Sequence, residues 1–428
     1  MSLIIALTAG IALLVVLARP RAGLFLMLFL VPLQNLFLIG NGATLIRYVG
    51  LAVFASWIIH IMATRKSLRG LFTKPVVAPL FVFLTLCLLS ILWTDPGLWQ
   101  TDMFTYLQMG MWVIILIDLI NTYGVLNKAL VWVFSGALIG AFLSIYEFFT
   151  KAQASQFNPR GRGGFDDPNY SSAIFILVLP YVFYRVRYSN GLQRMAWLGS
   201  TLILLSGVAF TVSRTGLLAI ALVLAGQYFK YSKAKTRVKY IVLLVVLILI
   251  TIPFWPWGNI ADRFSIGWSS SAYSNMRERT ELLQYGWKQF LTSPLFGNGL
   301  TTPNGADVIH NVFLSMAVKL GIFGFLAMYW LWLTTWRSLK YAHARAAAQS
   351  QEKQAELISA LQLSALIYLF FSLALSTELS RPQWLLFALG SICWGLVRDR
   401  QSMQVKKSKQ FAPEIAQASL PLSIKSDG

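Results

Sequence analysis

The sequence predicts an all-α polytopic membrane protein with about 12 transmembrane helices, and three observations support this fold class. Hydrophobic residues make up 57% of the 428-residue chain and charged residues only 12%. The mean hydropathy is +0.62. Apolar runs of spanning length, or close to it, follow one another along the chain. The net charge of +20 does not indicate nucleic acid binding, because Lys and Arg fall mostly in short loops between these runs.

Each predicted helix corresponds to one apolar run. The runs lie at residues 2–18, 23–40, 45–62, 76–93, 103–120, 129–149, 171–186, 196–212, 214–230, 239–255, 311–333, 357–376 and 383–397. The first run lacks a charged leader and a small-residue cleavage site, so we interpret it as a retained span. If the first two runs form one broken element, the chain has twelve spans; otherwise it has thirteen. Cys87 and Cys393 lie inside runs and indicate neither a disulfide framework nor a metal site.

Basic residues mark alternate loops, and the positive-inside rule assigns these loops to the cytoplasm. The remaining loops are then periplasmic, among them the short turn at 212–215 and the long loop at 256–310 between runs 239–255 and 311–333. Within the long loop, residues 276–291 predict an amphipathic surface helix. We therefore expect a single integral membrane domain over residues 1–400 and a disordered cytoplasmic tail over 401–428.

The pair His310-Asn311 stands at the predicted periplasmic mouth of a span, nine residues before Gly321-Ile322-Phe323-Gly324. A histidine in that position is a candidate proton acceptor. Eleven residues are close to three helical turns, so His310 and Gly321 are expected to share one helix face. The alternative is a capping histidine above glycines that only let helices pack closely.

Arginines in the predicted periplasmic loops are unexpected, because basic residues are usually more frequent in cytoplasmic loops. Each of them therefore needs an explanation. They are Arg47, Arg160, Arg162, Arg214, Arg263, Arg277, Arg279 and Arg381. Arg214 lies in a very short turn, where it either serves a site or snorkels to the membrane interface. Arg277 and Arg279 lie on the predicted surface helix, where lipid head groups compete with a site role. Arginine forks suit phosphate oxygens, so several converging on one cavity would bind a pyrophosphate.

A third feature is the turn at residues 161–170, where Asn169 or Ser171 is a candidate helix cap. The periplasmic carboxylates form no metal-binding pattern, and no nucleotide-binding loop is present. An enzyme here would therefore use a pre-activated donor carried by the membrane. Apart from Asp118 and Glu147, the runs show almost no ionisable residues, which argues against a transporter.

Taken together, these segments resemble the O-antigen ligase / O-antigen polymerase superfamily of bacterial membrane glycosyltransferases. Four signatures follow one another over roughly residues 160–330: the turn Gly164–Asn169, the pair Arg214 and Leu218, an Arg-led helix that runs into Pro294–Gly299, and the ligase-type set His310, Asn311, Gly321 and Gly324. The resemblance implies a glycosyltransferase-C-like architecture in the bacterial inner membrane, with the active site on the periplasmic side.

The resemblance also implies a reaction. A glycan would pass from undecaprenyl pyrophosphate to a sugar hydroxyl of lipid A–core, with inversion and without metal, cofactor or ATP. The implied catalytic residues are His310, Arg214 and Arg279, and the implied substrate-binding residues are Arg47, Asn169, Arg277 and Asn311. Arg279 fits the loop arginine of the family better than Arg277 does. One alternative is a polymerase that joins lipid-linked repeats, and a more distant one is an inorganic carbon transporter.

Overall fold

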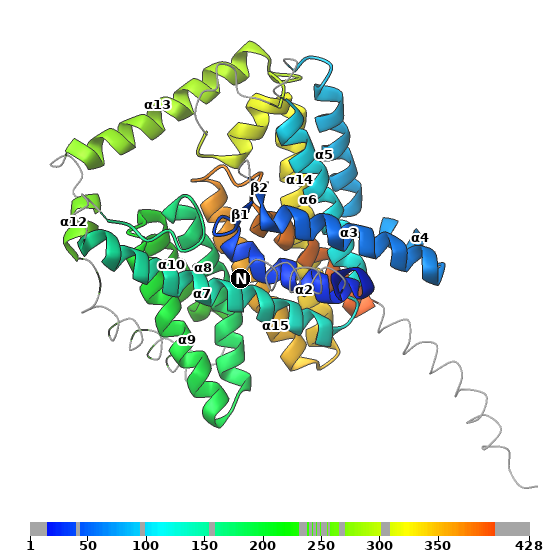
Figure 1. Ribbon diagram of the computed structural model, residues 1–428, viewed down its shortest axis with the longest axis horizontal. Helices are drawn as coiled ribbons and strands as arrows, with labels where there is room; N and C mark the ends of the chain where they lie inside the picture. Colours follow the sequence, from blue (N-terminus) through cyan, green and yellow to red (C-terminus); the bar gives the residue numbers. More distant parts are fainter. Residues whose placement is uncertain are drawn as a thin grey trace, which may run out of the picture.

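The computed structural model describes residues 15–39, 43–94, 99–153, 159–230, 257–264, 270–300 and 309–398, with single residues between 238 and 255. These parts are helical apart from one small antiparallel ribbon, in which Leu38 pairs with Thr44 (Figure 1). The elements are α2 (Pro20–Leu30), η1 (Val31–Leu33), β1 (Leu38–Ile39), β2 (Ala43–Thr44), α3 (Leu45–Thr64), α4 (Arg69–Phe72), α5 (Val77–Ser90), α6 (Trp99–Leu119), α7 (Tyr123–Gln153), α8 (Pro168–Tyr188), α9 (Gly191–Phe210), α10 (Arg214–Lys230), α12 (Trp257–Phe264), α13 (Ser270–Thr292), α14 (Val312–Ala348) and α15 (Glu352–Ser372). A last helix covers residues 381–398.

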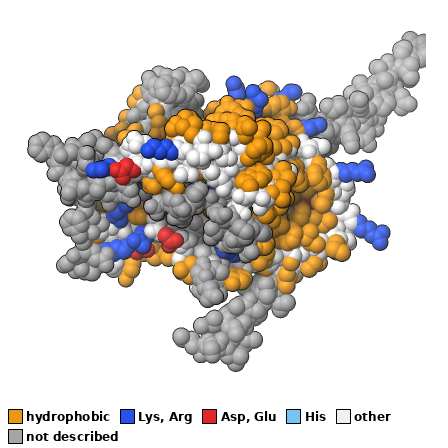
Figure 2. Space-filling model, turned by 90° about the horizontal axis from the view of Figure 1, so that it is seen from above, with side chains coloured by type: hydrophobic (Ala, Val, Ile, Leu, Met, Phe, Trp, Pro, Cys, Tyr) orange, Lys and Arg blue, Asp and Glu red, His pale blue; other side chains and the backbone are white. Residues whose placement is uncertain are grey.

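Five described helices are long and apolar enough to cross a membrane: Leu45–Thr64, Asp102–Leu119, Tyr123–Lys151, Val312–Ala348 and Glu352–Ser372. Figure 2 shows broad areas of hydrophobic side chains on the face it presents, with basic side chains toward the margins. The chain is thus a multi-pass membrane protein. The count of 12 or 13 spans stays a prediction, because residues 1–14 and most of the 239–255 run lie outside the described residues, as does the tail after residue 398.

The run at 23–40 does not form one spanning helix, contrary to the sequence prediction. Helix α2 ends at Leu30, a 3-10 turn follows, and the chain then enters the ribbon. Pro32 in the turn has no backbone N–H to donate, which favours the end of α2 just before it. The expected surface helix in the long loop is present as α13, which Figure 1 shows running along one edge of the molecule.

Helix α8 is the centre of the bundle. Nearly every residue from Ser171 to Tyr184 is buried, so no face of this helix is left for lipid. It packs against α7, α9, α10 and α15. The hydroxyl of Ser364 on α15 donates to the carbonyl of Leu177 at 2.7 Å, which satisfies a polar group in an apolar interior. The first residues of α8 are therefore held at a fixed place at one end of the bundle.

The ends of the helices lie at two opposite ends of the bundle. At one end, Arg187 near the C-terminus of α8 pairs with Glu352 and Glu356 at the start of α15. The N-termini of α8, α10, α14 and the 381–398 helix lie at the opposite end of the bundle. We call this end the motif end. The motif end is the end that the positive-inside rule assigns to the periplasm.

Helix α14 is broken at Gly321, where the backbone has φ 67° and ψ −161°. The rings of Phe313 and Phe325 lie 5.8 Å apart, whereas a straight helix would separate these positions by about 18 Å. The start of the helix thus folds back on the part after the break. The prediction that His310 and Gly321 share one helix face is wrong, because His310 precedes the cap at Asn311 and Gly321 is not helical.

The segment Pro294–Gly299 fills the break in α14. Ile322 N donates to Pro294 O at 2.8 Å, and Asn298 N donates to Val318 O at 2.8 Å. Backbone groups that the broken helix leaves without partners are thus satisfied by this segment. A Cβ at Gly321 would stand 2.1 Å from Leu295 O. Two of the sequence signatures are therefore the two halves of one interlock.

Candidate functional site

The turn before α10 is joined to the start of α8 by side-chain hydrogen bonds. Ser213 Oγ donates to Asn169 Oδ1 at 2.7 Å and accepts from Gly216 N at 3.2 Å, so it caps α10. Arg160 strengthens the joint, since its Nε donates to Thr211 O at 3.0 Å and its Nη2 to Asn169 Oδ1 at 3.4 Å. Arg214, the first residue of α10, is half-buried. Its position is thus fixed by the residues on either side of it.

The glycine-rich turn before α8 is bound to α7. Glu147 Oε2 accepts from Arg162 N at 2.7 Å, and Lys151 Nζ lies 3.5 Å from the same carboxylate. Gly163 has φ +54°, and a Cβ there would stand 2.2 Å from Gly140 O. The predicted N-cap of α8 is wrong. Asp167 caps this helix, because its Oδ1 accepts a hydrogen bond from Asn169 N at 2.6 Å, and neither Asn169 nor Ser171 takes this role.

The His310-Asn311 pair begins α14. Asn311 Oδ1 accepts from Phe313 N and Leu314 N, both at 3.0 Å, and its Nδ2 donates to Leu373 O at 3.2 Å. Asn311 is thus the cap of α14, a role that the sequence analysis did not assign to it. His310 is half-buried beside this cap.

The loop after α15 connects the histidine segment to α8. Ser376 Oγ donates to Ile309 O, and Tyr170 OH donates to Ser376 O at 2.6 Å. Tyr170 follows Asn169 directly, so a short series of hydrogen bonds runs from the Arg214 turn through Asn169 to the backbone beside His310. Tyr170 and Ser376 were missed by the sequence analysis, and no motif marks Ser376.

Helix α13 carries Arg277 and Arg279 and approaches the same region. Gly286 on α13 lies against Ile309 and Leu314, where a Cβ would meet their side chains at 3.0 and 3.2 Å. Arg277 is exposed and pairs with Glu281 one turn later at 2.7 Å, an interaction that stabilises a helix by only about 0.3–0.5 kcal/mol. Arg279 is half-buried. The choice of Arg279 over Arg277 stays a prediction.

Arg47 lies apart from these residues. It stands in the first turn of α3 and lines a small pocket together with Arg381, the first residue of the 381–398 helix. Arg381 Nη1 donates to Gln34 Oε1 at 2.8 Å. The next residue, Asn35, donates its backbone N–H to Gly164 O at 3.0 Å. The arginine pocket is therefore attached to the motif end through the glycine-rich turn.

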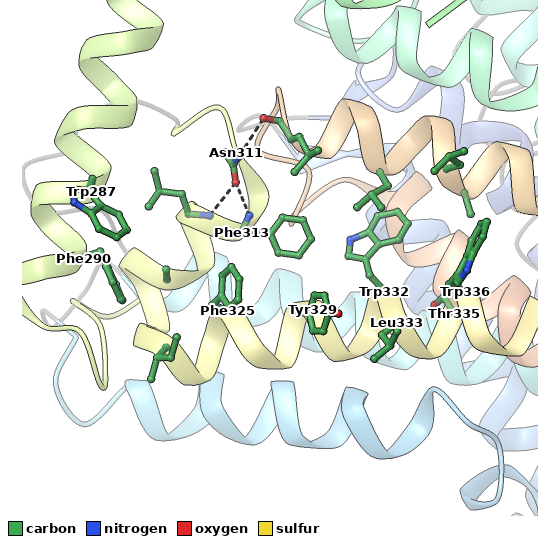
Figure 3. A pocket seen from close by; sticks show the side chains of 17 residues that line it. Trp287, Phe290, Asn311, Phe313, Phe325, Tyr329, Trp332, Leu333, Thr335 and Trp336 are labelled. Atoms are coloured by element: carbon green, nitrogen blue, oxygen red, sulfur yellow. Dashed lines mark hydrogen bonds between the residues drawn. The ribbon is translucent and has the colours of Figure 1, made fainter. Parts of the chain in front are cut away.

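A large apolar groove begins beside the histidine segment. It has a volume of about 860 Å³ and lies between α13, α14 and α15. Figure 3 shows Asn311 between Trp287, which reaches in from α13, and Trp332, with Phe325, Tyr329 and Trp332 following one another along α14. The lining is aliphatic and aromatic except for Asn311 and Thr335. The sequence analysis missed the groove, because it depends on the break at Gly321 and on the approach of α13.

Buried ionisable residues are also present, contrary to the sequence analysis. Lys319 on α14 is 7% exposed, and its Nζ lies 3.1 Å from Asp102 Oδ2 and 3.7 Å from Glu378 Oε1. Ser315 Oγ donates to the same Glu378 oxygen at 2.6 Å. Glu378 therefore pairs with a lysine. The sequence analysis missed Lys319 because its apolar neighbours concealed a single charge within the run.

The family model described as O-antigen ligase (Wzy_C) matches residues 199–329. The match extends from α9 through α10, α12 and α13 to the part of α14 just after its break. It includes Arg214, Arg279, His310 and the Pro294–Gly299 interlock, and it confirms the resemblance inferred from the motifs. No curated protein matches the chain.

Proposed function

We propose that this protein is a membrane glycosyltransferase, which moves a glycan from undecaprenyl pyrophosphate to a sugar hydroxyl of lipid A–core. The proposal starts from the match of residues 199–329 to the O-antigen ligase family model. The observation that carries the proposal is the joining of three motif segments at one end of the bundle. Hydrogen bonds link the Arg214 turn to Asn169, and Tyr170 and Ser376 link that position to the His310 segment.

In this proposal Arg214 and Arg279 bind the pyrophosphate and stabilise the negative charge that develops on it as the glycan leaves. His310 accepts the proton of the acceptor hydroxyl, whose oxygen attacks the anomeric carbon. The bond from that carbon to the pyrophosphate oxygen breaks, and the configuration inverts. The donor is already activated, so the reaction needs neither ATP nor a metal. The apolar groove beside Asn311 is the proposed place for the polyprenyl chain.

The test is glycan transfer by the purified protein in detergent, from a polyprenyl pyrophosphate donor to lipid A–core, with EDTA present and ATP absent. His310→Ala is expected to abolish turnover and to leave donor binding largely intact, because the arginines hold the pyrophosphate. His343→Ala is the matched control, since His343 lies far along α14 toward the opposite end. Loss of donor binding in the His310 variant would contradict the proposed division of roles.

The acceptor distinguishes the ligase from a polymerase. Product on lipid A–core supports the ligase, whereas lengthening of the lipid-linked glycan itself supports a polymerase. A transporter is the remaining candidate, and the buried Lys319 with its two carboxylates is the observation that favours it. Solute movement in sealed vesicles, without transfer to any glycan acceptor, would support transport.

A further inference from the structure

The turn before Arg214 contains a valine in a backbone conformation that valine rarely adopts. Val212 follows the C-cap of α9 and has φ +50°. The residue in this position is usually glycine, because a side chain is strained there, most of all a β-branched one. The other described non-glycine residues with positive φ, Arg65 and Ser350, are exposed, whereas Val212 is only 3% exposed. Such strain persists only where the surrounding structure holds the residue in place.

The side chain of Val212 belongs to a small hydrophobic cluster that is separate from the main core of the bundle. The other buried members of this Val212 cluster are Phe148 of α7, Phe210 of α9 and Ile260 of α12. The rings of Phe148 and Phe210 lie 5.0 Å apart and form an aromatic pair. Leu217 on α10 packs against the same cluster. The burial of the valine side chain therefore offsets the strain of its backbone.

Hydrogen bonds hold the backbone on both sides of Val212. The carbonyl of Thr211 accepts from Arg160 Nε at 3.0 Å, and the hydroxyl of Ser213 donates to the start of α8 at 2.7 Å. Between these two fixed neighbours, the φ and ψ of the valine set the angle between α9 and α10. Arg214 is the first residue of α10. The conformation of Val212 therefore determines the direction in which Arg214 leaves the turn.

The Val212 cluster also reaches the segment that carries the second arginine of the proposed site. Ile260 is 6% exposed and lies on α12, which contacts α13, and Figure 1 shows α12 close to one end of α13. Ile260 also lines a cavity together with Leu217 and Ile220 of α10, so α12 lies against α10. Arg214 stands at the start of α10 and Arg279 on α13. One cluster thus connects the elements that carry both arginines.

We infer that Val212 is a positioning residue, which sets the place of Arg214 relative to α12 through the Val212 cluster. Its effect on catalysis rests on the proposed function, in which Arg214 and Arg279 bind one pyrophosphate. The alternative is that Val212 only turns the chain between α9 and α10. Glycine makes such a turn without strain, so the two explanations predict opposite results for Val212→Gly.

The first experiment measures steady-state glycan transfer by the purified full-length protein, with donor and acceptor varied in turn. Val212→Gly removes the side chain that joins the turn to the cluster. The donor KM is therefore expected to rise about tenfold and kcat to fall, whereas the acceptor KM should not change. Partial unfolding would instead reduce the amount of active protein and leave both KM values unchanged. Val212→Ile keeps a branched apolar side chain and should retain most of the activity.

A matched pair of variants separates positioning from general destabilisation. Val212→Ala and Val223→Ala each remove two methyl groups from a buried valine, but Val223 on α10 belongs to the main core. Only Val212→Ala should raise the donor KM. A wild-type donor KM in both Val212→Gly and Val212→Ala would overturn the inference and leave Val212 as a residue of the turn alone.

Hydrogen–deuterium exchange tests the inference independently of glycan transfer. Exchange is followed in peptides that cover residues 211–220 and 257–264, for the wild type and the two alanine variants. A loosened cluster should speed exchange about tenfold in both peptides of Val212→Ala and in neither peptide of Val223→Ala. This pattern in a protein without transfer activity would support the positioning by Val212 and contradict the proposed function. Wild-type exchange at 257–264 in Val212→Ala would overturn the inference, whatever the transfer activity.

Discussion

At the scale of single residues, Gly321 decides how two motifs fit together. Its positive φ breaks α14, and the missing side chain leaves room for Leu295 O. A non-glycine residue with this backbone conformation is strained whatever space surrounds it. The ligase-type glycine is therefore explained by a close backbone approach.

Gly321→Ala is expected to destabilise the protein strongly. The backbone strain costs about 1–3 kcal/mol, and the new Cβ would also collide with the Leu295 carbonyl. Gly199→Ala on α9 is the control, since a Cβ there meets nothing within 4 Å. The measurement is the unfolding temperature in detergent, followed by size-exclusion chromatography after heating. Equal melting of the two variants would show that the break tolerates a side chain.

Arg214→Lys should lose much of the transfer activity although the charge is kept. Lysine offers a point charge where the proposed pyrophosphate contact needs a planar fork, and the loss of one good contact corresponds to about a tenfold lower rate. Transfer is measured in a strain that lacks the native gene, with protein level checked by blot. Arg69→Lys serves as the control. Wild-type transfer by the Arg214 variant would instead favour an interface anchor.

At the scale of elements, the N-terminus of α14 is the joint between the histidine segment and the rest of the bundle. Asn311 both caps the helix and binds the loop after α15, and Ser376 holds the backbone just before His310. Asn311 also lines the apolar groove. The capping of α14 and the orientation of His310 therefore depend on the same short segment.

Asn311→Ala should lower the stability by about 0.5–2 kcal/mol, the usual cost of losing an N-cap. Asn311→Ser keeps an oxygen that can accept from the backbone, so it should recover most of the difference. Thermal unfolding of the two variants measures this effect. Transfer by the serine variant then tests the substrate-binding role implied by the resemblance, since a stable but inactive variant supports that role. Equal melting of Ala and Ser variants would count against the cap.

At the scale of the whole molecule, Lys319 connects three parts of the chain that are distant in sequence. It joins the start of α14 to Asp102 on α6 and to Glu378 in the loop before the last helix. Trp384 Nε1 donates to Glu378 O at 2.8 Å and fixes that loop in turn. The cluster lies next to the break at Gly321, so it helps to hold the folded-back part of α14.

Lys319→Met is expected to cost about 3–5 kcal/mol, because it leaves the buried carboxylate of Glu378 and the partly buried one of Asp102 without their cation. The triple variant Lys319→Met, Asp102→Asn, Glu378→Gln removes all three charges and should recover much of the stability. Lys340→Met, at an exposed position of α14, is the control. Unfolding temperatures and the yield of monodisperse protein measure the effect. A triple variant as unstable as the single one would show that the charges are not the cause.

The sequence by itself determined that the chain crosses the membrane many times and that its motifs resemble those of the O-antigen ligases. These features follow from hydropathy, loop charge and short motifs, all of which are local. The interlock at Gly321, the capping by Asp167 and Asn311, the pairing of Lys319 with two carboxylates and the pocket of Arg47 with Arg381 were decided by the tertiary structure. Each depends on contacts between segments far apart in the chain, and a buried charge or a broken helix is stable only where such a distant partner satisfies it.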